Sequence, residues 1–285
     1  MLPSQIKELQ KIVPNELKTG DEMTRFEDPE YKIVQISEIK KQGLSKPKST
    51  GFNMFDSILE GGIREGDLMI ISGLSGRGKT HFSLQMIKHF SEIGYPVLLF
   101  SFEESMERIN WRLGNMGCDK EILCFTPKKL KSGYVNWLEE KILDGLHNYF
   151  IKIIVIDNLD FLTAEKQNNQ EDKWTLQSKI VAMLKRIAIE NEVSILLNAH
   201  VKKLDETTPK MEDLYGSGDT YKLADFVVFV HRLKEKKKNL KDEPSFTNET
   251  MIIIEKNRLN GRLSKFKIEM RDNLFYELPR ENQEG

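Results

Sequence analysis

The sequence predicts an α/β protein with a mostly parallel central sheet, helices on both faces and antiparallel hairpins near the C-terminus. Between Thr50 and Val230, short apolar runs alternate with segments of helical periodicity, which is typical of a parallel sheet with crossover helices. Beyond Val230, alternating runs are joined by the turn-forming pairs Asn260-Gly261 and Asp272-Asn273, which favour hairpins. The two patterns together indicate one large domain whose sheet ends in a C-terminal antiparallel edge.

The first 45 residues differ from the rest of the chain. Ile6, Leu9 and Val13 share one helical face in a charged segment, and Pro14 ends it. So short a segment cannot bury a core of its own. We therefore predict a helical arm or linker over residues 1–45 and a domain over residues 46–285. The arm either packs on its own domain or docks on a neighbouring subunit.

The elements of the domain follow from apolar runs and from helical stripes. The run Asp67–Ser72 reads as a buried strand, and Phe82, Met86 and Phe90 then share one helical face. Ser105 is placed to cap a helix. Further strands are predicted at 97–102, 151–156, 193–198, 226–230, 251–255, 264–270 and 274–277, and helices at 52–59, 108–113, 133–146 and 171–190.

The composition excludes several classes of protein. Hydrophobic residues make up 39% of the 285 residues and charged residues 31%, as in a soluble protein with a core. No apolar run approaches the roughly 20 residues that cross a bilayer, and the N-terminus lacks the apolar core of a secretory signal. Cys118 and Cys124 have no histidines nearby at zinc-ligand spacing, and reduced cysteines suit the cytoplasm. The net charge of −1 argues against nucleic-acid binding over the whole surface but permits a local basic lining.

The stretch Gly73–Thr80 matches the phosphate-binding pattern G-x-x-x-x-G-K-[ST] between a predicted strand and a predicted helix. The glycines let backbone N–H groups converge on phosphates, and the helix N-terminus adds positive potential. Lys79 would reach the β- and γ-phosphates, and the Thr80 hydroxyl would bind Mg²⁺. A chance glycine turn is disfavoured by this context. The residues expected to hold the nucleotide are Gly73, Ser75, Gly76, Arg77, Gly78, Lys79, Thr80, His81 and Asp157.

Polar residues at the ends of the other strands are the candidates for catalysis, because ligands of such sheets bind beyond the carboxyl ends of the strands. Asp157 follows an apolar run and would hold Mg²⁺ through water. Glu103 could activate the attacking water, but spacing alone does not separate it from Glu104. His200 is either a structural histidine or a sensor of the γ-phosphate.

Six segments in order carry a resemblance to a known family. They are Gly73–Thr80, Phe100–Ile109, Ile153–Leu162, Asn198–His200, Asp213–Gly218 and Glu255–Gly261. Together they resemble the RecA-type ATPase domain of DnaB-like and Twinkle-like replicative ring helicases, over about residues 50–278. Asp160 stands where DnaB-type relatives usually carry glutamine. The resemblance implies a RecA-like P-loop fold that uses ATP and Mg²⁺.

The resemblance also implies roles for single residues. It favours Glu103 over Glu104 as the catalytic base and makes His200 the sensor that couples ATP to DNA. Lys256 and Arg258 would act on the ATP of a neighbouring subunit. An arginine supplied in this way stabilises the transferring phosphoryl group only when subunits pack correctly. Without the resemblance, Arg258 would read as a solvated hairpin charge.

Loops that face the centre of a ring would bind DNA in such a family. Lysines there would contact phosphates, a Gly-Ser-Gly backbone would approach the strand, and Tyr215 would stack on a base. The alternative is a polar loop without that role. The candidates are Lys202, Lys203, Lys210, Tyr215, Gly216, Ser217 and Gly218. The basic segment Arg232–Lys241 reads as a solvated hairpin or as a second nucleic-acid patch.

The expected function is therefore that of an ATP-dependent helicase or translocase, a hexameric ring acting on single-stranded DNA in the cytoplasm or in a phage or organellar replication compartment. A separate primase or other replication proteins are expected partners. The alternatives are a RecA/RadA-like recombinase, a KaiC-like regulator, or an accessory or loader protein that uses ATP only as an assembly switch.

Overall fold

The computed structural model describes residues 44–127, 134–163, 173–201, 209, 221–235 and 245–279. The chain divides into two units, Met1–Leu44 and Ser45–Gly285. The fold described below lies within the second unit. No helix in these described ranges is long and apolar enough to cross a membrane.

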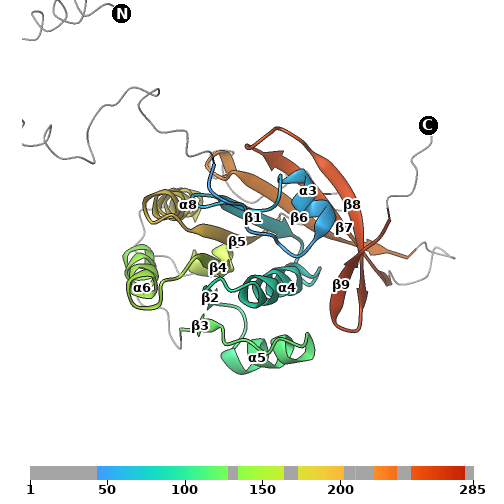
Figure 1. The fold of residues 1–285 in the computed structure, drawn as a ribbon, viewed down its shortest axis with the longest axis horizontal. Coiled ribbons are helices and arrows are strands. Elements are labelled where there is room, and N and C mark those ends of the chain that lie inside the picture. The colour runs from blue at the N-terminus through green and yellow to red at the C-terminus, as the bar shows by residue number, and fades with distance from the viewer. Residues whose placement is uncertain are drawn as a thin grey trace, which may run out of the picture. The chain divides into compact units, whose positions relative to one another are not determined.

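Nine described strands form a single sheet (Figure 1). The strand order is β3-β2-β4-β5-β1-β6-β7-β8-β9. The sheet is parallel from β3 to β6 and antiparallel from β6 to β9. The bounds are β1 Leu68–Gly73, β2 Val97–Ser101, β3 Leu123–Phe125, β4 Ile153–Asp157, β5 Ser194–His200, β6 Phe226–Lys234, β7 Phe246–Asn257, β8 Ser264–Arg271 and β9 Leu274–Glu277. The predicted α/β fold with C-terminal hairpins is therefore confirmed.

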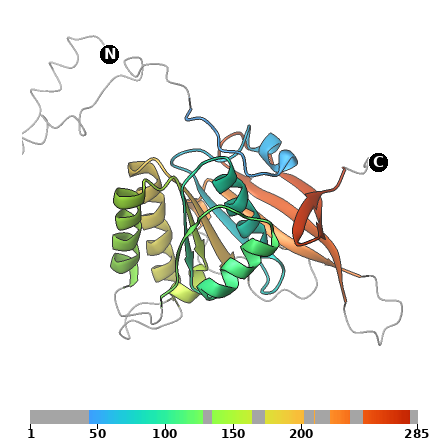
Figure 2. The same ribbon diagram turned by 60° about the horizontal axis from the view of Figure 1, so that its bottom comes forward.

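Helices cover both faces of the sheet (Figure 2). One apolar cluster joins the sheet to α3, α4 and α5, and a second joins it to α6, α7 and α8. Successive side chains of a strand point to opposite faces, so Leu68 and Ile70 of β1 enter one cluster while Met69 and Ile71 enter the other. The helices are α3 Asn53–Ile58, α4 Lys79–Glu92, α5 Met106–Asn115, α6 Tyr134–Tyr149, α7 Leu159–Leu162 and α8 Lys173–Glu190.

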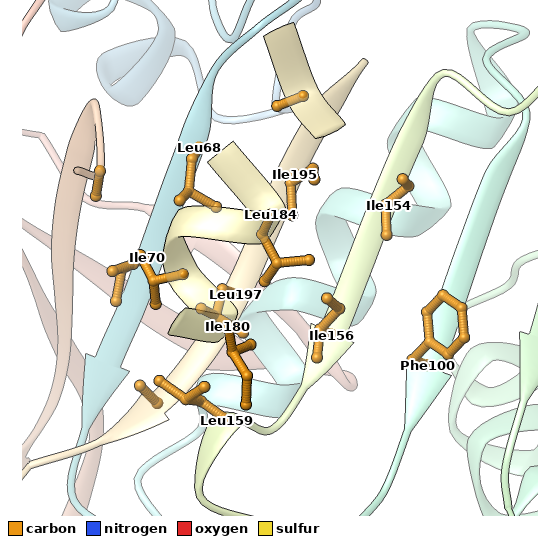
Figure 3. Close-up of a cluster of buried hydrophobic side chains, with 14 of the residues drawn as sticks. Leu68, Ile70, Phe100, Ile154, Ile156, Leu159, Ile180, Leu184, Ile195 and Leu197 are labelled. Carbon is orange, nitrogen blue, oxygen red and sulfur yellow. The ribbon is translucent and has the colours of Figure 1, made fainter. Parts of the chain in front are cut away.

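The long helix α8 closes the second cluster over the middle of the sheet. Ile180 and Leu184 of α8 lie over strand residues that include Ile156 and Leu197 (Figure 3). Each of these four side chains is fully buried. Because nearly every residue of the central strands is buried on both faces, their sequences read as continuous apolar runs rather than as alternating ones.

Three details depart from the sequence prediction. The edge strand β3 and the single-turn helix α7 were not predicted, because three or four residues are too few to show a period. Strand β7 begins at Phe246, earlier than expected, because Phe246 and Thr250 still pair with Lys234 and Arg232 of β6 across an irregularity in the register. The turn between β8 and β9 is as expected, with Asp272 and Asn273 both at positive φ, 47° and 61°.

Candidate nucleotide-binding site

The phosphate-binding loop connects the end of β1 to the start of α4. Gly73 has φ +153°, and a Cβ on it would lie 2.4 Å from the carbonyl oxygen of Val230. Gly78 directly precedes α4 at φ +97°, in the left-handed region that favours glycine. These two positions therefore require glycine for backbone reasons, and the loop they shape presents the free N–H groups of a helix N-terminus.

A pocket of about 210 Å³ lies over this loop. It brings together residues from the loop, from the segment after β2 and from the end of β5. They are Ser75, Gly76, Gly78, Lys79, Thr80, His81, Glu103, Glu104, Arg112 and His200. Of the loop residues expected to hold the nucleotide, Gly73 and Arg77 do not line it. The Arg77 guanidinium instead stacks on the Phe246 ring of β7, 3.6 Å from its centroid.

Lys79 is 6% exposed at the base of this pocket. Its Nζ donates to the carbonyl oxygens of Gly73, at 2.8 Å, and Leu74, at 3.0 Å, and lies 3.0 Å from His200 Nδ1. Burial lowers the pKa of Lys79 to about 8, against the opposing effect of the Asp157 carboxylate. An anion in the pocket would offset that cost of burial, which is what a phosphate-binding lysine needs.

Asp157 at the end of β4 faces Thr80 at the start of α4. The Thr80 hydroxyl donates to Asp157 Oδ2 at 2.7 Å, while Asp157 Oδ1 is buried without a hydrogen-bond partner. Burial raises the pKa of Asp157, because a buried carboxylate without a cation is disfavoured. The Thr80 hydroxyl and the Asp157 carboxylate, one oxygen of which is unsatisfied, fit Mg²⁺, which usually takes only one or two protein ligands beside phosphate and water. No group of three or more His, Cys, Asp or Glu among the described residues could hold a metal by itself.

The two adjacent glutamates after β2 have different surroundings. Both oxygens of Glu104 accept from Arg112, each at 2.8 Å, which neutralises that carboxylate. Glu103 faces the end of the sheet, where its Oε2 accepts from Asn158 Nδ2 at 2.5 Å and lies 3.9 Å from His200 Nε2. Its side chain is 41% exposed, so water can reach it. The geometry therefore favours Glu103 over Glu104 as a base.

His200 lies between Lys79 and Glu103 at the end of β5. Its backbone N–H donates to Asp160 Oδ2 at 2.9 Å, so α7 holds the end of the strand in place. Burial lowers the pKa of His200, and the Lys79 charge lowers it further. The contact with Lys79 at the pocket makes His200 a candidate for the predicted sensor.

Lys256 and Arg258 lie elsewhere. Strand β7 runs antiparallel to β6, so its last residues come to the edge of the sheet opposite the phosphate loop. Along the six residues of β1 the two edges are about 20 Å apart. Lys256 Nζ donates to the carbonyl oxygens of Tyr221, at 2.9 Å, and Lys222, at 2.8 Å. Neither basic residue can therefore reach the phosphate pocket of its own chain.

The Arg258 side chain is 57% exposed and lies 3.6 Å from Asp225 Oδ1. Its backbone N–H donates to the Asp225 carbonyl oxygen at 2.8 Å. Asp225 in turn accepts from Lys185 Nζ at 2.6 Å and from the Leu68 N–H at 2.8 Å. Asp225 thus holds Arg258 at the backbone and lies near its guanidinium, while more than half of the side chain stays exposed.

The expected DNA contacts fall outside the described residues. They are Lys202, Lys203, Lys210, Tyr215, Gly216, Ser217 and Gly218, and the tip of the basic segment, residues 236–241, also lies outside. Sequence reasoning missed two side chains at the site, Asn158 and Arg112. Asn158 directly follows Asp157 at a strand end, which could have marked it. Arg112 stands in a helix with no such signal, and only the fold brings it to Glu104.

Comparisons with known proteins agree with this geometry. The family model described as the DnaB-like helicase C-terminal domain matches residues 48–142 and 129–276. The replicative DNA helicase DnaB of Mycoplasma genitalium is 27% identical over 291 residues, which cover 88% of this chain and 59% of the relative. The DNA repair protein RadA of Campylobacter jejuni is 25% identical over 199 residues, 70% of this chain and 40% of the relative. The chain thus spans less than two thirds of the length of either relative.

Solved structures show the same fold. One of them, an isolated ATPase domain, has a TM-score of 0.69 at 20% identity, and the match covers 85% of this chain and 95% of that domain. A DnaB-like replicative helicase, described with its primase interactions, has a TM-score of 0.69 at 20% identity, and the match covers 97% of this chain and 71% of that one. The KaiC-like protein PH0186 of Pyrococcus horikoshii has a TM-score of 0.63 at 22% identity, and the match covers 82% of this chain and 100% of that one. The RecA-like ATPase fold is therefore shared by all three.

Proposed function

Because the chain belongs to the DnaB-like helicase C-terminal domain family, we propose that it is an ATP-dependent motor that translocates on single-stranded DNA and unwinds duplex ahead of it. One observation carries the proposal. A single pocket over the phosphate loop is lined by Lys79 and Thr80 at the start of α4, by the exposed carboxylate of Glu103 after β2 and by His200 at the end of β5. The buried carboxylate of Asp157 at the end of β4 accepts from the Thr80 hydroxyl beside this pocket. That set is what phosphoryl transfer to water requires.

Each residue has a defined task in the proposed reaction. Lys79 and the loop N–H groups bind the β- and γ-phosphates, and Thr80 with Asp157 would hold Mg²⁺. The ion would neutralise charge on the phosphate oxygens. Glu103 orients the attacking water and accepts its proton, because it is the glutamate not paired with an arginine. His200 contacts Lys79 and begins the segment that contains the DNA-contact candidates, so it is placed to relay the state of the γ-phosphate.

The proposed assembly is a ring, with hydrolysis at the interfaces between subunits. Lys256 and Arg258 stand at the sheet edge opposite the pocket, so a head-to-tail arrangement would bring them to the ATP of a neighbour. A hexamer closes such contacts without free ends. Single-stranded DNA would lie along Lys202, Lys203, Lys210 and the segment Tyr215–Gly218, and a primase is the proposed partner at the fork. The cytoplasm, or a phage or organellar replication compartment, is the proposed location.

The proposal is tested by ATP turnover with and without single-stranded DNA, with light scattering on the same samples. We expect DNA to raise turnover, and we expect the active fraction to be an oligomer. Turnover that DNA leaves unchanged would contradict the motor. A fork-unwinding assay then separates a helicase from a translocase.

The similarity to RadA and to a KaiC-like protein supports a second candidate within the same ATPase class. A recombinase would form filaments on DNA and leave a forked duplex intact, and a regulator would hydrolyse ATP regardless of DNA. An accessory or loader protein that uses ATP as a switch would assemble with nucleotide but turn it over negligibly. Turnover, light scattering and the fork-unwinding assay together distinguish all of these.

A further inference from the structure

Asn158 stands at the centre of the polar network over the phosphate loop. It follows Asp157 at the end of β4 and is 2% exposed. Its Nδ2 donates to Glu103 Oε2 at 2.5 Å and lies 3.1 Å from His200 Nε2. Its Oδ1 accepts from the Phe161 N–H at 3.1 Å, which caps α7. One side chain thus contacts the base, the sensor histidine and the next helix.

The oxygen and the NH₂ group of the Asn158 amide have different roles. The oxygen satisfies a free N–H at the start of α7, a role that aspartate or serine can also fill. The NH₂ group donates to a carboxylate, and neither aspartate nor serine can replace it at this reach. Leu159 and Leu162 of α7 are fully buried, so the helix anchors the amide rigidly.

We propose that Asn158 is a positioning residue that holds the Glu103 carboxylate at the mouth of the phosphate pocket and ties its position to His200. The inference rests on the proposed function, because Glu103 needs a reaction in which to act as base. Glu103 follows β2 on a partly exposed segment, and the Asn158 amide is a buried, directional contact on it. Removing that donor keeps the Glu103 carboxylate but no longer fixes its orientation toward the attacking water.

The network also connects the base to the phosphates. Lys79 contacts His200 Nδ1, and Asn158 contacts the opposite ring nitrogen. A neutral imidazole has one acceptor nitrogen, so His200 can accept from Lys79 Nζ or from Asn158 Nδ2 but not from both at once. Phosphates that draw the Lys79 ammonium toward them leave His200 Nε2 to accept from the amide that also donates to Glu103. Occupancy of the pocket therefore changes the surroundings of the base through two residues that do not themselves touch the reacting water.

The test uses the full chain with Asn158 replaced by aspartate, serine or alanine. Asn158→Asp and Asn158→Ser keep a cap for α7 and remove the amide donor, whereas Asn158→Ala removes both. We expect kcat to fall about tenfold in the Asp and Ser variants, a part of the roughly 10²–10⁴-fold that a general base contributes. We expect KM for ATP to stay within about twofold in both, since nucleotide binding is kept. The melting temperature should stay near wild type in Asn158→Ser, which keeps the cap, and should fall in Asn158→Asp, which buries a carboxylate beside Glu103.

Two readouts separate positioning from a structural role. In Asn158→Asp a second carboxylate beside Glu103 favours its protonated form, so the acid limb of the pH–rate profile moves to higher pH. Asn158→Ser carries no charge and leaves that limb in place. In a Glu103→Gln background, Asn158→Ser lowers kcat no further, because the base it aims is gone. Unchanged kcat and pH profile in both capped variants, or full additivity with Glu103→Gln, overturns the inference.

The wild-type control distinguishes this inference from the motor proposal. Wild-type turnover that ignores DNA contradicts the motor, while a tenfold loss in Asn158→Ser still supports positioning of a hydrolytic base. Wild-type protein without any turnover overturns both. Should Asn158→Asp not fold, Asn158→Ser carries the kcat test alone.

Discussion

The two edges of the parallel sheet differ in how complete they are. At the edge where the strands end, Lys79, Glu103 and His200 come from separate segments and line one pocket, and Asp157 accepts a hydrogen bond from Thr80 of the same pocket. At the edge where the strands begin, Arg258 projects 57% exposed, with one ion pair at 3.6 Å to Asp225. The first edge holds, within one chain, the groups that are proposed to bind phosphate. The second presents a charge that has no phosphate within its own chain.

The difference follows from strand direction. All parallel strands carry their carboxyl ends to one edge, so polar residues that follow them meet there. Strand β7 runs the other way and delivers its last residues to the opposite edge. Lys256 and Arg258 can therefore act on a bound phosphate only if a neighbouring chain supplies it, which is why the proposed function depends on a neighbour.

The largest expected effect comes from removing the proposed contact of Arg258 with the phosphate site of a neighbouring subunit. Arg258→Ala should lower turnover by about 10³-fold or more, the range of an arginine that completes a phosphoryl-transfer site. Arg262→Ala is the matched control, because Arg262 is exposed in the same turn and should change little. Mixing Lys79→Ala protein with Arg258→Ala protein should restore part of the activity, since some interfaces then hold both wild-type groups. Mixed oligomers without recovery would contradict action in trans.

The next effect tests the phosphate edge alone. Glu103→Gln should lower kcat by about 10²–10⁴-fold and leave nucleotide binding intact, because it removes the base and keeps the shape. Glu104→Gln is the matched control. It weakens the pair with Arg112 and should cost less than about tenfold. Equal losses in the two variants, measured by steady-state turnover, would remove the distinction between them.

The sequence predicted the phosphate edge better than the opposite one. Strands buried on both faces read as apolar runs, and the residue after each run is easy to find, as with Asp157 and His200. Partners that come from helix faces or loops carry no such mark. Arg112 is one of two arginines in α5, and only the fold shows that it pairs with Glu104 rather than Glu103.

At the opposite edge the sequence identified Lys256 and Arg258 only through a family resemblance. Spacing along a strand gives the face of a residue but not the end of the sheet it reaches, which depends on pairing direction. The hydrogen bonds from Lys256 to the carbonyl oxygens of Tyr221 and Lys222 likewise become visible only in the three-dimensional fold. The candidate DNA segment remains a prediction.

A titration at the edge where the strands begin gives a smaller effect. Burial, with a contribution from Asp225, raises the pKa of Asp67 to about 6 from 3.8. The folded protein therefore binds a proton on Asp67 more readily than the unfolded chain does. The stability that this protonation contributes is fully present below about pH 3.8 and is lost as pH rises through about 6. Asp67→Asn should be more stable than wild type above pH 6, by at most about 3 kcal/mol, because partial exposure screens the charge.

Urea unfolding at a series of pH values checks this prediction. The Arg64 N–H donates to Asp67 Oδ2, and an asparagine oxygen can accept the same bond. The gain should therefore vanish near pH 4 and grow toward pH 7. Asp119→Asn, at an exposed position, is the control and should change the unfolding free energy by less than about 0.5 kcal/mol at every pH. A gain in Asp67→Asn that does not vary with pH would show that the Asp67 charge is not its cause.

The smallest expected effect concerns the place where the antiparallel strands touch the phosphate loop. Arg77 stacks at 3.6 Å on Phe246, and Arg232 approaches the same ring at 5.8 Å. A cation over an aromatic ring at a partly exposed site contributes about 0.5–1 kcal/mol. A double-mutant cycle with Arg77→Met and Phe246→Leu should therefore give a coupling free energy of that size in chemical unfolding. Arg271 and Tyr276, with the guanidinium 4.9 Å from the ring centroid in the β8–β9 hairpin, provide the matched pair. If the stack also fixes the loop, Phe246→Leu should raise KM for ATP about twofold, whereas Tyr276→Leu should leave it unchanged, since only the first ring contacts a residue of Gly73–Thr80.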